Sequence, residues 1–90
     1  MKIVKMSTSW CPPCRALAPI FEKVSQMEEF SNIEFVSFNV EQERDEPLVK
    51  KFPVRSVPTV LVLDENDNMI GRTQGYLAES ELIGFIKQFV

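Results

Sequence analysis

A run of five residues, Thr59–Leu63 (TVLVL), constrains the fold of this chain more than any other stretch. A nearly continuous apolar run is typical of a strand that is buried on both faces of a sheet. With the residue that follows, it predicts a strand over Thr59–Asp64, and burial on both faces requires other elements on either side. The chain has 90 residues, which suffice for one small domain, so we expect a single domain over residues 1–90.

Apolar spacing assigns the neighbouring elements. Apolar residues at three- and four-residue steps predict a helix from Pro12 to about Ser31 and a second, amphipathic helix at the C-terminus. Short stretches rich in Val, Ile or Phe predict strands, and a charged stretch with a few apolar residues predicts a short helix interrupted or started at Pro47. The strands are Lys2–Ser7, Ile33–Val40 and Met69–Gln74, the short helix lies within Glu43–Phe52, and the C-terminal helix carries Leu82, Phe85, Ile86, Phe89 and Val90.

The order of these elements is β-α-β-α-β-β-α. Strand–helix–strand units imply right-handed crossovers and a parallel pair of strands. The turn residues Glu65–Asn68 imply that the last two strands pair antiparallel, with Met69–Gln74 at a sheet edge. The sequence therefore predicts an α/β fold with a four-stranded mixed sheet and helices on both faces.

Charge and hydropathy exclude several classes of function. A net charge of -3 leaves no basic surface for nucleic acid. The apolar runs are too short to span a membrane, so no membrane partner is expected. The apolar N-terminal stretch is broken by Lys5 and shows no export signal, which favours a cytoplasmic protein. In a reducing compartment a permanent structural disulfide is not expected.

Both cysteines, Cys11 and Cys14, flank Pro12 and Pro13 at the predicted start of the first helix. A C-x-x-C in a strand–helix–strand unit is a redox signature. If Cys11 is the N-cap, its sulfur accepts a hydrogen bond from the backbone N–H of Cys14, and the helix dipole favours its thiolate. Cys14 is then close enough to attack a mixed disulfide on Cys11. The two prolines stiffen this turn at little cost, because first-turn N–H groups have no partner within a helix.

Other interpretations of the cysteines stay open at this point. The pair could be two buried thiols in an inert loop. A structural zinc site needs about four ligands, and this chain has two cysteines and no histidine, so only a dimer could assemble one. We therefore expect no metal and no cofactor other than the cysteine pair itself. An acidic run is predicted to be a solvated surface, and it comprises Glu41, Glu43, Asp45 and Glu46.

Several segments together resemble the thioredoxin family. WCPPC (Trp10–Cys14) is similar to the family's active-site W-C-x-P-C, and VRSVPT (Val54–Thr59) resembles the segment that carries its cis-proline, which would be Pro58. The resemblance runs essentially end to end and implies a thioredoxin-like fold. Further matches are Pro19 at a helix-kinking proline, Asn39–Gln42 (NVEQ) after the second strand, and Gly75 beside the substrate groove.

The resemblance implies a role for each matching residue. Cys11 would be the exposed attacking nucleophile, and Cys14 the resolving thiol. Trp10 would lie beside them and contact partners, with a plain hydrophobic plug as the alternative. An extended substrate segment would dock in a groove by strand addition. The groove would be lined by Val57, Pro58 and Gly75.

Two departures from the family limit this transfer. The usual first strand and helix are absent, so the chain resembles a minimal form of the fold, similar in extent to glutaredoxins. The family's buried acidic residue, six positions before the first cysteine, is replaced by Lys5, and its accompanying lysine by Ser37. Lys5 could favour the Cys14 thiolate by charge, pass protons if burial lowers its pKa, or reach water without a catalytic part.

The leading functional prediction is a thiol–disulfide oxidoreductase that reduces disulfides on partner proteins. A reductase would return electrons to the cysteine pair, and targets such as a ribonucleotide reductase are implied by the family alone. We expect a monomer. The alternatives are a disulfide oxidase or isomerase with the same cysteines, and a non-catalytic module that holds a peptide in the groove.

Overall fold

The computed structural model describes residues 1–90 and contains four strands, three α-helices and one 3₁₀-helix. The predicted order of elements and the α/β class are confirmed. No helix combines the length and the apolar character that crossing a membrane requires. The elements are β1 (Lys2–Ser7), α1 (Pro12–Ser25), η1 (Glu28–Phe30), β2 (Glu34–Asn39), α2 (Pro47–Lys51), β3 (Thr59–Leu63), β4 (Met69–Gln74) and α3 (Glu79–Lys87).

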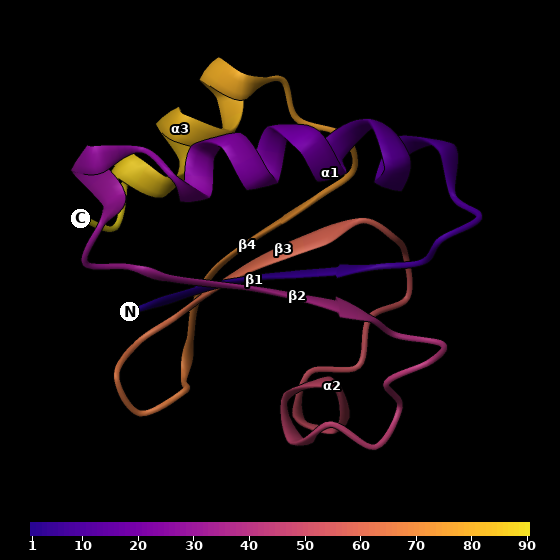
Figure 1. Cartoon of the computed structure of the whole chain (residues 1–90). Coiled ribbons are helices and arrows are strands. Elements are labelled where there is room, and N and C mark those ends of the chain that lie inside the picture. The colour runs from indigo at the N-terminus through magenta and orange to yellow at the C-terminus, as the bar shows by residue number, and fades with distance from the viewer.

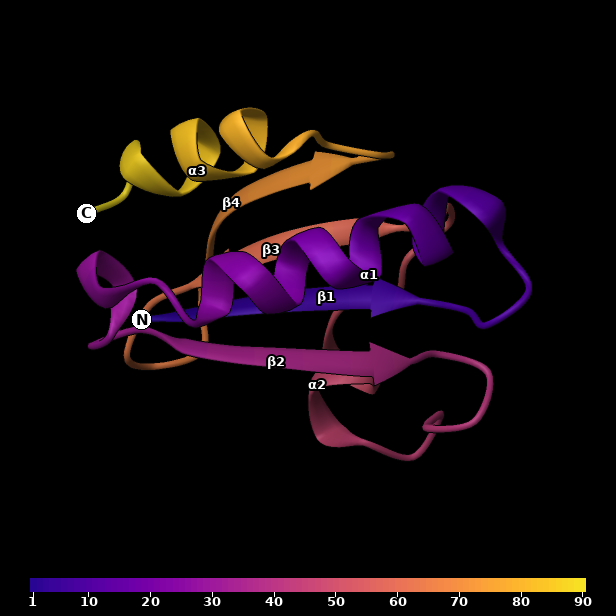
Figure 2. The same cartoon turned by 45° about the horizontal axis from the view of Figure 1, so that its top comes forward.

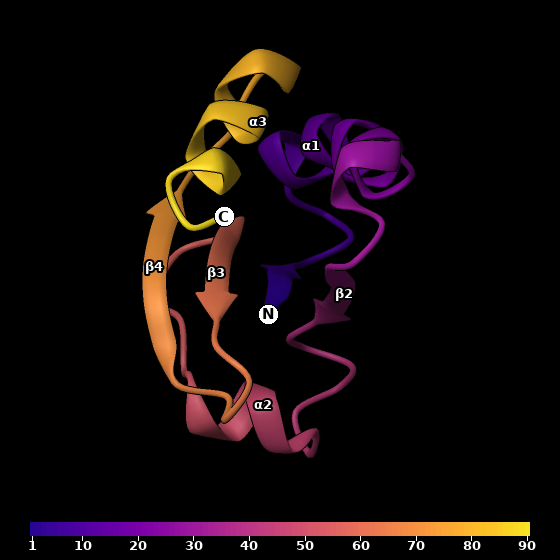
Figure 3. The same cartoon turned by 90° about the vertical axis from the view of Figure 1, so that its left-hand side faces the viewer.

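The four strands form one mixed sheet in the order β2-β1-β3-β4 (Figure 1). The strands β1 and β2 are parallel and β3 and β4 are antiparallel, as the sequence predicts. The strands β1 and β3 also pair antiparallel, which the sequence analysis does not predict. Figure 2 shows β2 and β4 at the two edges. The helices α1 and α3 cover one face, and α2 lies against the opposite face (Figure 3). The sheet is thus covered on both faces, as predicted.

The core lies in two layers on either side of β3, all five residues of which are buried. Between the sheet and the helices α1 and α3 lies a cluster of nine buried residues. On the face of α2 a smaller cluster holds Val4, Met6, Leu61 and Leu63. Successive side chains of a strand point to opposite faces, so β1 and β3 supply both layers. The prediction of a strand buried on both faces is confirmed.

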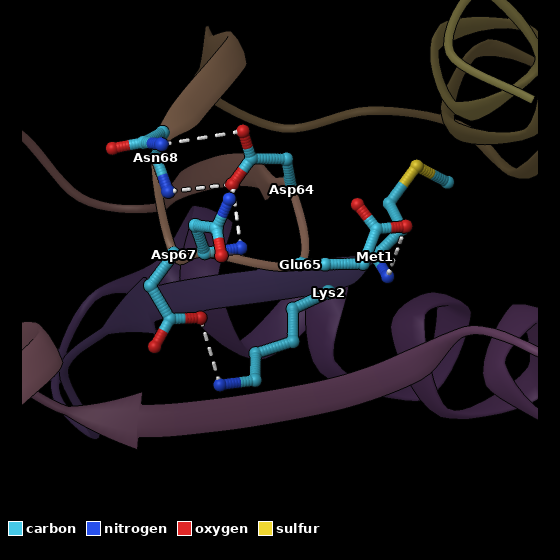
Figure 4. Close-up of polar contacts among 7 residues, drawn as sticks. Met1, Lys2, Asp64, Glu65, Asp67 and Asn68 are labelled. Carbon is cyan, nitrogen blue, oxygen red and sulfur yellow. Dashed lines mark hydrogen bonds and ion pairs between the residues drawn. The ribbon is translucent and has the colours of Figure 1, made fainter.

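The predicted turn between β3 and β4 is built around Asp64 (Figure 4). Its carboxylate accepts hydrogen bonds from the backbone N–H groups of Asn66 and Asn68, and these lower the pKa of Asp64. Asp67 adopts a left-handed φ of 60°, and its carboxylate lies 2.9 Å from the ammonium of Lys2. The turn is therefore tied to the first strand as well as closing the hairpin.

The first helix is shorter than predicted. It ends at Ser25 instead of near Ser31, and the next two backbone N–H groups bond back to Lys23 and Val24. A 3₁₀ turn then places Phe30 in the core. Since Phe30 continues the apolar spacing, the sequence pattern could not show where the α-helix stops. Strand β2 is one residue shorter than predicted at each end, and β3 ends one residue earlier than predicted, at Leu63. The helix α2 begins at Pro47, as predicted. Phe89 and Val90, which were expected in the C-terminal helix, follow the end of α3.

Candidate functional site

Three connections meet at one end of the sheet because of the strand register. Met6 near the end of β1 lies opposite Thr59 at the start of β3, and Thr59 lies opposite Gln74 at the end of β4. The loop after β1, the loop before β3 and the segment after β4 are therefore neighbours. These loops carry Trp10–Cys14, Val57–Pro58 and Gly75, so the fold brings the predicted site residues to one edge.

Cys11 caps the N-terminus of α1, as the sequence predicts. Its backbone is extended, with φ -81° and ψ 117°, and its sulfur accepts a hydrogen bond from the backbone N–H of Cys14 at 3.2 Å. Pro12 and Pro13 occupy the first two helical positions. The Cys11 thiol in turn donates to the carbonyl oxygen of Val57 at 3.6 Å. One sulfur therefore links the helix N-terminus to the loop before β3.

The expectation of an exposed Cys11 is wrong. Only 4% of its surface is exposed, because the sulfur lies between the first turn of α1 and the Val57 carbonyl. The exposed neighbour is Trp10, with 62% of its surface open to solvent, so it does not act as a hydrophobic plug. Its indole N–H donates to the carboxylate of Glu41 at 2.8 Å. That bond holds an aromatic ring at the surface beside a covered sulfur.

The loop before β3 and the end of β4 are joined at the site. The Val57–Pro58 peptide bond is cis, and Pro58 is buried. The backbone N–H of Gly75 donates to the Pro58 carbonyl at 2.8 Å. Gly75 has a φ of 90°, a left-handed conformation that favours glycine. Tyr76, the only tyrosine of the chain, is exposed next to this glycine.

The family model described as Thioredoxin matches residues 1–88, almost the whole chain. The chain belongs to the thioredoxin family. The family resemblance of the WCPPC and VRSVPT segments is confirmed at the level of family and fold.

Individual relatives agree with this assignment. Thioredoxin-3 of Dictyostelium discoideum is 44% identical over 57 residues, which span 63% of this chain and 51% of that protein. Thioredoxin of Mycoplasmoides gallisepticum is 31% identical over 85 residues, 94% of this chain and 80% of that protein. The thioredoxin structure from Fasciola hepatica has a TM-score of 0.82 and 26% identity, covering 99% of this chain and 80% of that one. The matched stretch spans about half to three fifths of the length of several of the curated thioredoxins, Thioredoxin-3 among them.

Within this thioredoxin fold, Cys14 lies deeper than Cys11, with 2% of its surface exposed. Burial raises the pKa of the Cys14 thiol, and a hydrogen bond with Cys11 raises it further. The backbone and side chain of Thr8 act in the opposite direction. Both cysteines are free thiols. The pair therefore combines a sulfur at a helix N-terminus with one held protonated in the core.

Lys5, at the position of the family's buried acidic residue, is itself buried, with 6% of its surface exposed. Its ammonium lies 5.3 Å from the ring centroid of Phe21 and forms no ion pair. Burial lowers the pKa of Lys5, and attraction by Cys14 and Glu22 partly opposes this. The side chain of Lys5 is thus largely enclosed, and its three alternative roles (through charge, through proton transfer, or as a lysine whose ammonium reaches water without a catalytic part) stay predictions. Ser37, opposite Lys5 on β2, is exposed.

Pro19 lies inside α1 and is exposed, away from the end of the sheet that carries the cysteines. A shallow pocket of about 330 Å³ lies elsewhere, near α2, and none of the predicted site residues lines it. The pocket is lined by Val40, Arg44, Val49, Pro53 and Val54.

No three His, Cys, Asp or Glu residues are grouped to hold a metal ion.

Sequence reasoning missed three residues of this site. Glu41 is exposed, in agreement with the predicted solvated acidic surface, and it also accepts the hydrogen bond of Trp10 from a position 31 residues away. Tyr76 is an exposed aromatic next to the predicted groove residue Gly75, a signal that the sequence does contain. Thr8 lies against Cys14, and nothing in its sequence position distinguishes it from its serine neighbours.

Proposed function

We propose that this protein is a thiol–disulfide oxidoreductase that reduces disulfides of partner proteins, with Cys11 as the attacking and Cys14 as the resolving thiol. The observation that carries this proposal is the hydrogen bond from the Cys14 N–H to the Cys11 sulfur at the start of α1. A charge-assisted bond to a sulfur anion is stronger than one to a neutral thiol, and the helix dipole adds to it. The thiolate is the reactive form of a cysteine.

The reaction consists of two exchanges between sulfur atoms. The Cys11 thiolate attacks one sulfur of the substrate disulfide, and the other sulfur leaves as a thiolate that takes up a proton. Cys14 then loses its proton and attacks the Cys11 sulfur, forming the Cys11–Cys14 disulfide and releasing the second substrate thiol. The substrate gains two electrons and two protons, and the enzyme is oxidised. A dithiol reductase or small thiol must then reduce the enzyme again.

The exposed surroundings of Cys11 suit an extended protein segment. Trp10 and Tyr76 are exposed aromatic side chains, a residue type that is enriched in protein interfaces. Pro58 has no backbone N–H, so this residue of the loop offers no hydrogen-bond donor that could bond in place of a bound segment's backbone. A segment that pairs with the backbone near Val57 would bring its disulfide to Cys11, which already contacts the Val57 carbonyl.

Members of the thioredoxin family generally act on disulfide-containing substrates and receive electrons from a reductase. We extend this to the present chain and propose a protein disulfide as its substrate. We also propose that it works as a monomer in a reducing compartment, the cytoplasm. In a reducing compartment a cysteine pair is more often catalytic than structural, which supports this setting.

The reduction potential of the Cys11–Cys14 pair tests the proposed direction of electron flow. Equilibration with dithiothreitol or glutathione buffers should give a value near about -270 mV, that of thioredoxin. A value between about -180 and -120 mV would instead favour disulfide formation or isomerisation. If no reversible couple is found, the protein is not a redox enzyme and a peptide-binding module becomes the better interpretation.

Two variants test which cysteine attacks the substrate disulfide and which resolves the mixed disulfide. Cys14→Ser should still attack a protein disulfide and accumulate a stable mixed disulfide, because resolution is blocked. Cys11→Ser is the matched control and should form no mixed disulfide at neutral pH, since the pKa of the remaining Cys14 thiol is raised. Mass spectrometry of the intact adducts distinguishes the two. Adducts on Cys11→Ser alone would reverse the assigned roles.

A further inference from the structure

The hydroxyl of Thr8 is an unpaired polar group inside the protein. Thr8 follows β1 directly and has 6% of its surface exposed. Its side-chain oxygen is the one buried side-chain nitrogen or oxygen of the chain without a hydrogen-bond partner. Buried polar groups are nearly always paired in folded proteins, and an exception calls for a physical explanation. A partner that exists only in another state of the site is one such explanation.

The Cys14 sulfur is the atom on which Thr8 acts. Both the backbone N–H and the hydroxyl of Thr8 stabilise the charged form of this sulfur. In the structure Cys14 is a free thiol, and the Thr8 hydroxyl is not in hydrogen-bonding geometry with it. A neutral thiol is a weak acceptor, whereas an anionic acceptor binds donors about twice as strongly as a neutral one.

We propose that Thr8 is a positioning residue for the resolving step, in which its hydroxyl and backbone N–H bind the Cys14 thiolate and direct it at the Cys11 sulfur. This inference rests on the proposed function, because it concerns the second of the two exchanges. It assigns a purpose to the unpaired hydroxyl.

The surroundings of Cys14 also place its ionisation after the first exchange. In the dithiol, the hydrogen bond with Cys11 and the charge of Cys11 both raise the pKa of Cys14. Once the Cys11 sulfur is bonded to substrate it carries no charge, so its coulombic effect on Cys14 is removed while burial still opposes Thr8. The other charged groups nearby are Lys5 of β1, which Cys14 attracts, and Glu22 of α1, which acts on Lys5.

The step balances without an added reactant. The proton of Cys14 passes to solvent, and the electron pair left on sulfur forms the bond to the Cys11 sulfur. The bond between Cys11 and the substrate sulfur breaks, and the substrate leaves as a thiolate that is protonated by solvent. The Thr8 hydroxyl donates throughout this step and is unchanged at its end.

Thr8→Val removes the hydroxyl and keeps the shape of the side chain, and Thr8→Ser keeps the hydroxyl. Ser9→Ala is the matched control, since Ser9 is the exposed neighbour. The reduced proteins are mixed with one equivalent of 5,5′-dithiobis(2-nitrobenzoate) over a range of pH in a stopped-flow instrument. The first nitrothiobenzoate is released by Cys11 and the second by Cys14. In Thr8→Val we expect the second release to slow about tenfold, the effect of losing one hydrogen bond to a charged group, with its pH midpoint raised.

The first release should be unchanged in Thr8→Val, and Thr8→Ser and Ser9→Ala should match the wild type in both phases. A second release in Thr8→Val with the wild-type rate and pH midpoint would overturn the role of Thr8. So would a slower release with an unshifted midpoint that Thr8→Ser does not restore, because that pattern indicates packing alone. A wild-type protein that releases only one equivalent would overturn the proposed function itself, whatever the variants do.

Discussion

The two faces of the sheet are covered very unequally. On one face α1 and α3 lie against the strands, and nine buried residues form a continuous cluster. On the other face the five-residue helix α2 lies over four buried strand residues and contributes none of its own (Figure 3). Most of the apolar residues on this second face are half-buried, and they are Val36, Phe38, Val40, Leu48, Val49, Phe52 and Val54.

The candidate site belongs to the heavily covered face. Cys14 shares the buried side of α1 with Leu17, Phe21 and Val24, so the helix that carries the thiols also anchors the larger core. Packing of that core therefore holds the first turn of α1 in place. Substitutions on the α1 side should therefore affect both stability and thiol chemistry, whereas substitutions on the α2 side should affect stability alone and by less.

The largest difference is expected between two phenylalanines on opposite faces. Phe21→Ala removes a ring that is 4% exposed and packs edge-on against Phe35 at 5.5 Å between centroids. Such a change costs about 3–5 kcal/mol, a large part of the roughly 5–15 kcal/mol that stabilises a typical domain. Phe38→Ala on the α2 side removes a half-buried ring and should cost about half as much. Urea unfolding of both variants measures the difference.

Thiol reactivity provides the second half of this test. Phe38→Ala should react with a small disulfide at the wild-type rate, whereas Phe21→Ala should react at a different rate because the missing ring lies under the Lys5 ammonium, which interacts with the Cys14 sulfur. If Phe38→Ala costs as much stability as Phe21→Ala, the two faces are equally important for folding and the comparison is wrong.

A smaller difference is expected between two glycines, Gly71 and Gly84. A Cβ at Gly71 in β4 would overlap the ring of Phe89, whereas a Cβ at Gly84 in α3 meets nothing within 4 Å. The tip of the Phe89 ring would have to shift, so Gly71→Ala should cost about 1 kcal/mol, the low end of the usual cost of overpacking. Gly84→Ala should stabilise the protein by about 0.5–1 kcal/mol, because alanine is the better helix former.

The thermal midpoints of the two variants should move in opposite directions. The double variant Gly71→Ala with Phe89→Ala provides the control, since it removes the ring that the new methyl group meets. A Gly71→Ala protein as stable as the wild type would mean that Phe89 moves aside freely and contributes little to covering this face.

Local patterns predicted most of this fold because they depend on neighbouring residues only. The strands β1 and β4 match their predicted bounds, and the cap on Cys11 follows from the spacing of two residues within one turn. The predicted end of α1 is wrong because Phe30 continues the apolar spacing although it lies in the 3₁₀-helix that follows α1. Periodicity reports which side chains are buried, and it does not report the backbone path between them.

The site was predictable in its membership and not in its contacts. Cys11, Val57, Pro58 and Gly75 do meet, because the register of β1, β3 and β4 brings their loops together. The burial of Cys11, the bond between Trp10 and Glu41 and the unpaired hydroxyl of Thr8 depend on segments that are distant in sequence or on side-chain orientation. No spacing rule contains that information.

The smallest expected effect concerns Lys5, the one buried charged residue, which lies on the face of α1. Lys5→Met keeps the length of the side chain and removes a charge that has no ion-pair partner. At pH 7 we expect the free energy of unfolding to rise by about 1 kcal/mol, because the native state no longer keeps an unpaired charge away from water. Urea unfolding of both proteins at pH 7, 8, 9 and 10 measures this difference and its pH dependence.

The sign of that pH dependence follows from the lowered pKa of Lys5 in the native state. Between this lowered pKa and the ordinary value of 10.5, the unfolded chain binds more protons than the native one, so the Lys5 contribution to stability rises with pH. The advantage of Lys5→Met should be full below the native pKa and shrink as pH approaches 10.5. Cys14, whose pKa is raised, contributes the opposite slope to both proteins, so it largely cancels in the difference. A Lys5→Met protein less stable than the wild type at pH 7 would show that attraction by Glu22 and the Phe21 ring outweighs the cost of burial, and that the well-covered face is stabilised by its one charge.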